Sequence, residues 1–577
     1  MCKSVLKVHR WEFLMKKKIL LYIGCLLLVL ITAVGCKKNE GITPDGQIEN
    51  NGQEDSKGEG DSKEEVTKQE LNMIDDNYRN FYEIFVGGFY DSDGDGMGDI
   101  NGIIEKLDYI NDGDDTTDTD LGFNGIWLMP IMPSVSYHKY DVVDYYDIDP
   151  EFGSLDDFKR LIKACEERGI ALIIDFVFNH TSSKHPWFLD AVSYLEKLPE
   201  GEEPNLEENP YVGYYNFTRD SKTGDKYHKA GSSDWSYEGV FWGGMPDLKL
   251  ENPKLREEIE HIAKFWLDLG VSGFRLDAAK EFYSGGVESN VEVLDWFTNY
   301  VKSQKEDAYI VAEVWESADN IAQYYESGVL SLFNFPLAQH TGLIIKTARQ
   351  FPDTSGAKYA KTLLEIDAKY RSKNPDYIDA PFISNHDTTR VSAQAVNNEE
   401  QMKLAAGLLL TLNGSPYVYY GEEIGMNSSG TKDENKRLPM RWSSTDQTGI
   451  PNPPVGADPV VQKFPSVEEQ MADPLSIYNY YKRAVRLRNE NPEIARGQLS
   501  IVEELCSDAI SAVKKVYEGS EIVILSNVST DVQSISLADG NLSGMSLRGF
   551  LTVDGSEVTV TDDVVSMPKY SIAILKK

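Results

Sequence analysis

The sequence predicts an α/β protein: a (β/α)8 TIM barrel with an inserted domain after strand 3 and a C-terminal antiparallel β-sandwich. Three observations predict it. Short apolar runs alternate eight times with helical stretches, a long segment interrupts the third repeat, and alternating strands take over near the C-terminus. Continuous apolar runs between helices are typical of a parallel sheet that is buried on both faces. A chain of 577 residues has room for about two to four domains.

The eight apolar runs are the predicted barrel strands. Helical stretches at 154–169 and 253–270 carry the amphipathic period and stop at Gly. A structureless loop as long as 181–250 would be unusual, so we expect a small inserted domain beside the barrel mouth. The strands are predicted at "YEIFVGGF" (82–89), "GIWLMP" (125–130), "ALIIDFVFN" (171–179), "SGFRLD" (272–277), "YIVAEV" (309–314), "LSLFNF" (centred on 331–335), "PFISNHD" (381–387) and "PYVYYGEE" (416–423).

Domain boundaries follow from these patterns. The barrel is predicted over residues 75–180 and 251–495, with the inserted domain at 181–250. From 496 to 577 the pattern changes to alternating strands such as "SEIVILSNVS", "VQSISL" and "YSIAILK", which predict the C-terminal β-sandwich.

The N-terminus carries an export signal. An apolar run of sixteen residues, 19–34, follows three lysines; it is short for a membrane span of about 20 residues and typical of a secretory signal. It ends in "AVGC", which resembles the lipidation box of bacterial lipoproteins, with Cys36 as the acylated residue. We therefore expect a signal peptide at 1–36, a disordered tether at 37–74 and a lipid-anchored protein on the extracellular face of the membrane. An uncleaved signal anchor is the alternative.

The net charge excludes some partners. The chain has 93 acidic and 57 basic side chains, a formal net charge of -36. Such a surface argues against binding nucleic acid, or anionic lipid through a basic face. We expect a neutral substrate, membrane contact only through the N-terminal lipid, and a monomer.

Polar residues follow the apolar runs. In a barrel of this kind they would lie at the carboxyl ends of the strands, where active sites are found. Three acids lie at the ends of predicted strands four, five and seven, and buried carboxylates are costly unless they are paired or used. The strand-end residues are Asp175, Asn179, His180, Arg275, Asp277, Glu313, His386 and Asp387.

Retaining glycoside hydrolysis uses such acids. It needs an ionised carboxylate as the nucleophile and a second, protonated carboxyl group about 5–5.5 Å away. Arg275 and Asp277 share one face of a strand, so the guanidinium would hold Asp277 ionised as the nucleophile. Neighbouring carboxylates would keep Glu313 protonated as the acid. Asp387 would stabilise the positive sugar ring, while the two histidines would donate hydrogen bonds to sugar hydroxyls.

The chain resembles glycoside hydrolase family 13, the α-amylase family, over nearly all of residues 75–577. Eight segments carry the resemblance, the first four as signature regions in the expected order: "DFVFNH" (175–180), "GFRLDAAK" (273–280), "EVW" (313–315), "FISNHD" (382–387), "GGMPDL" (243–248), "YHKYDVVDYY" (137–146), "YYGEEIGM" (419–426) and "KRLPMRW" (436–442).

The resemblance implies the roles of the site residues. Asp277 would be the nucleophile, Glu313 the acid/base and Asp387 the transition-state stabiliser. Tyr140 would stack under the sugar at the cleavage point, and Lys280 would contact the leaving-group side. The expected substrate-binding residues are Tyr140, His180, Arg275, Lys280 and His386, with Asp175 and Asn179 as structural support.

A calcium site is predicted at "DSDGDGMGD", residues 91–99. Its acids follow the spacing of an EF-hand calcium loop, although position twelve is Gly102 rather than Glu. The loop also resembles the calcium loop of relatives of oligo-1,6-glucosidases, in which a main-chain carbonyl completes the shell. The predicted ligands are Asp91, Asp93, Asp95, Asp99 and the Met97 carbonyl. A second calcium site of many α-amylases is doubtful, because Glu281 replaces its His.

Bond specificity depends on small differences. Ala278, Ala279 and Lys280 after the nucleophile resemble α-1,4-acting amylases, whereas "GGMPDL" resembles oligo-1,6-glucosidases and neopullulanases. We expect an endo-acting α-amylase of the lipoprotein type that acts on starch or malto-oligosaccharides. Neopullulanase, oligo-1,6- or α-1,4-glucosidase is the first alternative, and a non-catalytic glucan-binding barrel the second. Trp235 and Trp242 are expected to be core residues of the inserted domain.

Overall fold

The computed structural model describes residues 76–220, 226–283 and 286–577. The predicted signal peptide, the lipidation site Cys36 and the tether at 37–74 lie outside these residues. Within the described part of the chain, no helix has the length and apolar character needed to cross a membrane.

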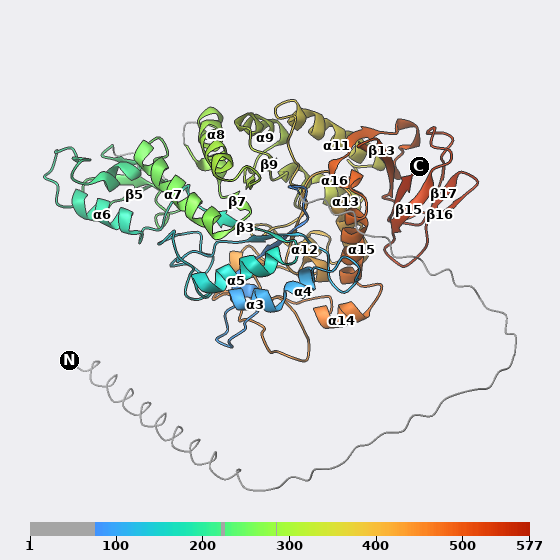
Figure 1. Ribbon diagram of the computed structural model, residues 1–577, viewed down its shortest axis with the longest axis horizontal. Coiled ribbons are helices and arrows are strands. Elements are labelled where there is room, and N and C mark those ends of the chain that lie inside the picture. Colours follow the sequence, from blue (N-terminus) through green and yellow to red (C-terminus); the bar gives the residue numbers. More distant parts are fainter. Residues whose placement is uncertain (1–75, 221–225, 284–285) are drawn as a thin grey trace, which may run out of the picture. The chain divides into compact units, whose positions relative to one another are not determined.

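A curled parallel sheet forms the barrel. Seven strands lie in the order β10-β1-β2-β3-β7-β8-β9, and every neighbouring pair is parallel. Figure 1 shows β3, β7 and β9 with helices α5, α7, α8 and α9 outside them. The strands are β1 (Phe81–Ile84), β2 (Gly125–Leu128), β3 (Ala171–Phe176), β7 (Gly273–Leu276), β8 (Tyr309–Ala312), β9 (Ser331–Leu332) and β10 (Tyr417–Tyr419).

The eighth position of the barrel is occupied by residues 380–382. Two isolated parallel bridges, Phe333 with Ala380 and Phe382 with Tyr417, join this segment to β9 on one side and β10 on the other. Pro381 lies between the bridges and has no N–H to donate, which explains why the predicted strand at 381–387 is reduced to bridges. The ring is therefore closed, as the eightfold sequence pattern predicted.

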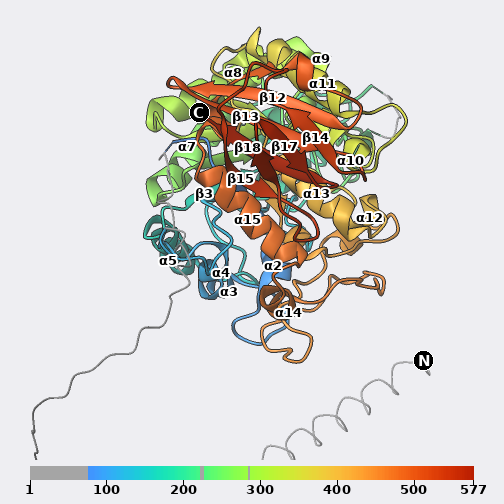
Figure 2. The ribbon, with the colours of Figure 1, turned by 90° about the vertical axis from the view of Figure 1, so that its right-hand side faces the viewer.

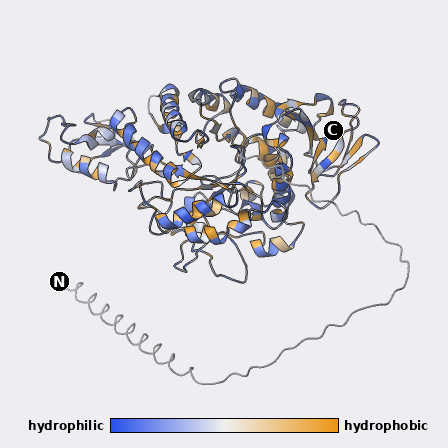
Figure 3. Ribbon diagram, viewed as in Figure 1, coloured by the Kyte–Doolittle hydropathy of each residue, from blue (hydrophilic) through white to orange (hydrophobic). Residues whose placement is uncertain are grey.

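Helices cover the outside of the sheet, and their ends follow the sequence signals. Ser154 and Asp157 form a capping box at the start of α5, and Gly270 ends α7 in the left-handed conformation. Figure 3 shows blue and orange bands along these helices, as expected for amphipathic elements. The helices are α2 (Val86–Phe89), α3 (Ile100–Glu105), α4 (Leu107–Ile110), α5 (Leu155–Glu166), α7 (Pro253–Leu269), α8 (Val287–Gln304), α9 (Ala318–Tyr324), α10 (Leu343–Ala348), α11 (Gly356–Arg371), α12 (Val391–Gln394), α13 (Glu399–Leu410), α14 (Val467–Ala472), α15 (Ile477–Asn489) and α16 (Glu493–Arg496).

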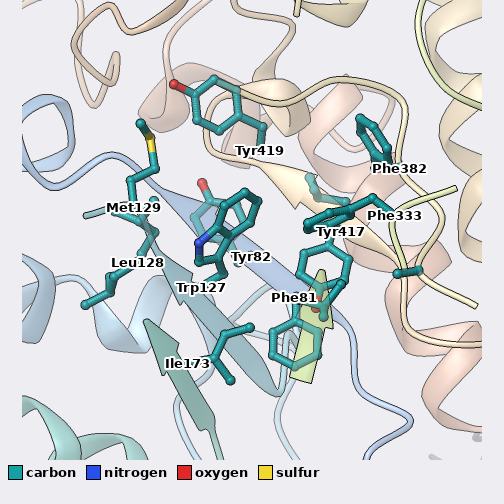
Figure 4. Close-up of a cluster of buried hydrophobic side chains, with 14 of the residues drawn as sticks. Phe81, Tyr82, Trp127, Leu128, Met129, Ile173, Phe333, Phe382, Tyr417 and Tyr419 are labelled. Atoms are coloured by element: carbon teal, nitrogen blue, oxygen red, sulfur yellow. The ribbon is translucent and has the colours of Figure 1, made fainter. Parts of the chain in front are cut away.

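Aromatic side chains fill the inside of the barrel (Figure 4). The ring of Phe81 stacks on Tyr417 at 4.7 Å and on Tyr309 at 5.2 Å between centroids, which ties β1 to strands on both sides of the ring. Trp127 packs against Phe333 at 5.4 Å. Rings of this size bury a large apolar area in the barrel interior and leave the polar chemistry to the strand ends.

Between β3 and α7 the chain leaves the barrel and forms the inserted region. It contains α6 (Pro186–Leu195) and a small antiparallel sheet in the order β4-β6-β5. The bounds of these strands are Phe217–Thr218 for β4, Tyr227–Lys229 for β5 and Ser236–Glu238 for β6.

The C-terminal region has two antiparallel sheets, ordered β11-β12-β13-β18-β15 and β14-β17-β16. Val523 and Leu525 on one sheet share an apolar core with Val565 and Met567 on the other. Alternate residues of β13 and β18, namely Ile522, Ile524, Ile572 and Ile574, belong to the barrel's core. The middle of the larger sheet is therefore buried on both faces; β13 and β18 are labelled in Figure 2. The strands are β11 (Gln498–Ile501), β12 (Ile510–Tyr517), β13 (Ser520–Asn527), β14 (Gln533–Ser536), β15 (Ser546–Leu551), β16 (Thr559–Thr561), β17 (Val564–Met567) and β18 (Ser571–Lys576).

Two buried cations lie where this region meets the barrel. Arg488 donates to the main-chain oxygens of Leu410, Leu412 and Gly414. Lys515 donates to those of Thr411, at 2.8 Å, and Ile494, at 2.7 Å. The acceptors at 410–414 directly precede β10, so these cations lie at the end of the barrel opposite to the predicted site.

Candidate active site

The carboxyl ends of neighbouring strands bring the predicted acids together. Asp175 lies in β3, and its register partner in β7 is Arg275. Asp277 follows β7 directly, and Glu313 follows β8. Close approach of β7 to β8 requires Gly273, because a Cβ there would lie 1.8 Å from the main-chain oxygen of Tyr309.

Arg275 is the centre of this arrangement and is fully buried. Its Nη1 donates to both oxygens of Asp175, at 2.9 and 3.0 Å, and to Oδ1 of Asp277 at 2.6 Å, while Nη2 donates to Oε2 of Glu313. Although burial lowers the pKa of Arg275, Asp175, Tyr140 and Asp277 raise it well above its usual range. One buried guanidinium therefore donates hydrogen bonds to three carboxyl groups.

The contact with Glu313 differs from the sequence-based expectation, which surrounded this residue only with carboxylates. A guanidinium donor favours the ionised, accepting form of a carboxyl group. The acid role predicted for Glu313 would therefore require a change in this contact. Beside it, burial raises the pKa of Asp175 to about 7, against the opposing effect of Arg275.

Asp387 lies between two cations. Its Oδ2 is 3.1 Å from His386 Nε2 and its Oδ1 is 2.8 Å from Arg437 Nη2. Burial would raise the pKa of Asp387, but His386 and Arg437 together hold it well below its usual range. These two contacts favour the ionised form of Asp387.

Tyr140 connects the two groups of charges. Its hydroxyl is 2.9 Å from Asp175 Oδ2, to which it donates, and 2.6 Å from His386 Nε2, while its ring stacks on that of His386 at 5.4 Å. The Tyr140 side chain also lines the cleft described next. This position allows the ring to contact a sugar above it.

A cleft of about 620 Å³ opens over these residues. Phe241 and Trp242 of the inserted region and Trp315 after β8 expose 48%, 56% and 41% of their surface. Trp235 is buried, as predicted, but the prediction that Trp242 is a core residue is wrong. The lining residues are His138, Tyr140, His180, Phe241, Trp242, Met245, Asp277, Ala278, Lys280, Glu281, Glu313, Trp315, Asp387, Asp433 and Arg437.

The remaining predicted residues lie around the cleft. His180 is almost fully buried beneath it, and its Nε2 has no hydrogen-bond partner among the described residues. Asn179 lies beside it, with its Nδ2 3.2 Å from His180 Nδ1. Lys280 forms an ion pair with Glu316 at 3.0 Å. Ala278 has a φ of 49°, and this left-handed conformation costs about 1–2 kcal/mol directly after the proposed nucleophile.

Sequence reasoning missed three site residues. Arg437 and His138 lie in segments that resembled the family, and both line the cleft, but no role was predicted for them. Glu83 lies within the apolar run of β1, and its Oε1 is 2.5 Å from His386 Nδ1. An acid inside an otherwise apolar strand was the available signal for Glu83.

The acidic loop at 91–99 brings carboxylates together only in part. Oxygens of Asp91, Asp93 and Asp99 lie within 4.8 Å of one another, a donor set that fits a hard cation such as calcium. Asp95 does not join this cluster, and its Oδ1 accepts from the Met97 amide instead. Asp95 and the Met97 carbonyl therefore stay predicted ligands outside this cluster.

The sequence and the fold were compared with those of known proteins, and similar proteins were found. A family model described as "Alpha amylase, catalytic domain" matches residues 83–497. Alpha-amylase 3 of Dictyoglomus thermophilum is 38% identical over 461 residues, covering 78% of this chain and 85% of that protein. The oligo-1,6-glucosidase of Parageobacillus thermoglucosidasius is 27% identical over 537 residues, covering 79% and 91%. The structure of Eubacterium rectale Amy13B matches with a TM-score of 0.85 and 42% identity, covering 88% and 97%.

Proposed function

The chain belongs to the α-amylase family of glycoside hydrolases, and we propose that it hydrolyses α-1,4-glucosidic bonds within starch and related α-glucans, with retention of configuration. The observation that carries the proposal is the shared position of Asp277 and Glu313 on one guanidinium. Two carboxyl groups held by the same planar group face one short gap, which suits a retaining mechanism better than the wider spacing of an inverting one.

In this mechanism Asp277 attacks the anomeric carbon and forms a covalent glycosyl-enzyme. Glu313 gives its proton to the departing glycosidic oxygen and later removes a proton from the attacking water. Arg275 orients Asp277 through the 2.6 Å contact. Asp387, ionised between His386 and Arg437, stabilises the positive charge that develops on the sugar ring.

The walls of the cleft support a long substrate. Phe241 and Trp242 of the inserted region and Trp315 after β8 are exposed aromatic side chains that line the cleft. Aromatic faces suit sugar rings because they offer rigid apolar surface beside polar hydrogen-bonding groups. Aromatic surface from two separate segments of the chain suits several sugar units of a glucan, and the proposed action is therefore endo.

The alternative specificity is that of a neopullulanase, an oligo-1,6-glucosidase or an α-1,4-glucosidase. The "GGMPDL" segment, which contributes Met245 to the cleft, and the similarity to an oligo-1,6-glucosidase favour it. A non-catalytic glucan-binding barrel would not need three acids in the cleft, so we rank it last.

Three further properties are proposed from the sequence: a bound calcium ion, a lipid anchor and a monomeric state. Calcium would bind at Asp91, Asp93 and Asp99, where it would link the ends of one loop. Acylation at Cys36 would anchor a monomer to the outer face of the membrane. Metabolic labelling with palmitate tests the anchor: label that persists in Cys36→Ala would contradict it.

A product time course on amylose and on pullulan tests the proposed specificity. We expect rapid loss of amylose chain length, mixed short oligosaccharides and little action on pullulan. Panose or maltotriose from pullulan, or glucose from short oligosaccharides alone, would move the assignment to the alternative. Asp277→Asn and Glu313→Gln serve as controls, because activity at the native level in either variant would contradict the assigned mechanism.

A further inference from the structure

Glu83 is a buried acid that the mechanism above does not use. It lies in the middle of β1 between Trp127 of β2 and Tyr419 of β10, and it is only 1% exposed. No ion pair with Lys or Arg is formed by Glu83 within the described part of the chain. Burying a carboxyl group without a strong partner is costly, so its partner identifies its role.

That partner is His386. Oε1 of Glu83 lies 2.5 Å from His386 Nδ1 and also accepts from the His386 main-chain amide at 3.3 Å. Two contacts on one oxygen fix both the backbone and the ring of the residue that directly precedes Asp387.

The opposite edge of the imidazole faces acceptors as well. Nε2 lies 3.1 Å from Asp387 Oδ2 and 2.6 Å from the hydroxyl of Tyr140. Because Tyr140 donates its own hydrogen to Asp175, its oxygen acts toward His386 as an acceptor. A histidine that faces carboxylates through both ring nitrogens can satisfy both only as the doubly protonated imidazolium.

The surroundings set the charge balance of this histidine. Trp127 packs edge-on against the ring at 5.5 Å and contributes no charge. Beyond the direct partners, Arg437 faces Asp387 and Arg275 faces Asp175. Burial lowers the pKa of His386, but Asp387 and Glu83 outweigh it and raise this pKa to about 9.

We propose that Glu83 is a positioning residue that keeps His386 charged, so that Asp387 is held in one orientation by a permanent donor. The chain of contacts runs from the interior of β1 through the imidazolium to the acid that stabilises the transition state. The role of Asp387 rests on the proposed function, whereas the charge of His386 does not.

The experiment compares Glu83→Gln with the full-length wild-type chain. Glutamine keeps the size and an acceptor oxygen but removes the negative charge. In the variant, the pKa of His386 should fall toward the usual histidine value of about 6.5, so that His386 loses its proton between pH 5.5 and 8. We therefore expect the ratio of variant to wild-type kcat/KM on amylose to fall about tenfold over this interval. The ratio cancels any pH dependence that the two proteins share.

Glu423→Gln is the matched control. Glu423 is also buried in the barrel and accepts from the hydroxyls of Tyr82 and Tyr109 rather than from a histidine. Its ratio to wild type is expected to be independent of pH. Glu83→Asp, which keeps the charge, is expected to restore a flat ratio. A flat ratio for Glu83→Gln would mean a merely structural role and would overturn the proposal.

An NMR titration of the imidazole signals separates this proposal from the proposed function. The His386 signal, assigned by its loss in His386→Gln, is expected to titrate in the wild type well above the usual range and to shift downward in Glu83→Gln. Titration near pH 6.5 in the wild type would overturn the proposal. If amylose is not hydrolysed, the proposed function fails, but the NMR result still decides the charge of His386. The wild-type titration also decides the matter if Glu83→Gln does not fold.

Discussion

The two ends of the barrel hold buried positive charge in different ways. At the catalytic end, Arg275 is surrounded by the carboxyl groups of Asp175, Asp277 and Glu313. At the opposite end, the acceptors of Arg488 and Lys515 in the described part of the chain are main-chain oxygens. The pKa directions differ accordingly: carboxylates raise the pKa of Arg275, while burial lowers that of Arg488 to about 9 and that of Lys515 well below its usual value.

This difference separates structural charge from catalytic charge. A carbonyl group has a fixed dipole and cannot take up a proton, so the cations it surrounds can only join segments of the chain. A carboxyl group can change its protonation or exchange its hydrogen-bond partner when a substrate arrives. In this barrel, the buried cation shared by three carboxyl groups lies at the end of the proposed site, and the two buried cations held by main-chain oxygens lie at the other end.

The largest expected effect is at the catalytic end, in Arg275→Lys. Lysine keeps the charge but cannot donate in a planar fork to three carboxyl groups. We expect kcat on amylose to fall by about 100-fold or more, since a misplacement of ~1 Å costs that order. Lys514→Arg, at a half-exposed position of β12 that pairs with Glu521, is the control and should leave kcat unchanged. A kcat within about threefold of wild type would show that the fork is dispensable.

The pH dependence of stability should have opposite signs at the two ends. The raised pKa of His386 contributes stability that is complete below pH 6.5 and lost as pH rises through about 9, on the order of 3 kcal/mol for a shift of this size. The lowered pKa of Lys515 has the opposite effect on the free energy of unfolding. Because the unfolded chain binds this proton more tightly than the folded chain, the folded state is destabilised at low pH. The contribution of Lys515 improves as pH rises toward 10.5.

Urea denaturation of His386→Gln and Lys515→Met at pH 6.5 and pH 9 measures these contributions. The first variant should lose less stability than wild type over this interval, and the second should lose more. Parallel curves for all three proteins would contradict the distinction between the two ends.

The acidic loop is a third arrangement, because its aspartates form no ion pair with a Lys or Arg among residues 76–220, 226–283 and 286–577. Asp91, Asp93 and Asp99 converge there, and a cation should stabilise the loop. At a calcium concentration of 100 times Kd the gain is about 2.7 kcal/mol, so chelation should lower Tm by a few degrees. Asp93→Asn should reduce this difference, whereas Asp95→Asn, outside the cluster, should keep it. An unchanged Tm after chelation would contradict the calcium proposal.

The smallest expected effect lies at the mouth of the cleft, where Trp242 carries no charge. Removal of one stacking ring in Trp242→Ala should raise KM for amylose about three- to tenfold, the order of 1 kcal/mol for an exposed aromatic contact, with kcat unchanged. Leu206→Ala, an equally exposed apolar residue of the inserted region, is the control and should have no effect. A fall in kcat instead would place Trp242 nearer to the chemistry than the cleft suggests.

The sequence predicted the barrel and the grouping of Asp175, Arg275 and Asp277 because both are local patterns. An apolar run that ends in a charged residue indicates a strand and its functional end together. The eighth position was harder to predict, because Pro381 leaves only two bridges where a strand was expected.

The missed residues depend on contacts that are distant in sequence. Arg437 contacts Asp387 across fifty positions, and Glu83 contacts His386 across 303. No local period encodes such pairs. Trp242 was assigned to the core because most tryptophans are buried. The cluster of Asp91, Asp93 and Asp99 without Asp95 could not be predicted, because spacing does not show which way a loop carboxylate turns.

The segment at 380–382 has a consequence for how the molecule opens. A position joined by two isolated bridges protects its amides less than a full ladder does, so hydrogen exchange should begin at this seam. The same segment leads directly to His386 and Asp387, whereas Asp277 and Glu313 follow regular strands. Local opening would thus displace Asp387, the proposed transition-state stabiliser, while Asp277 and Glu313 stay in place. On heating, activity would then decline before the fold is lost.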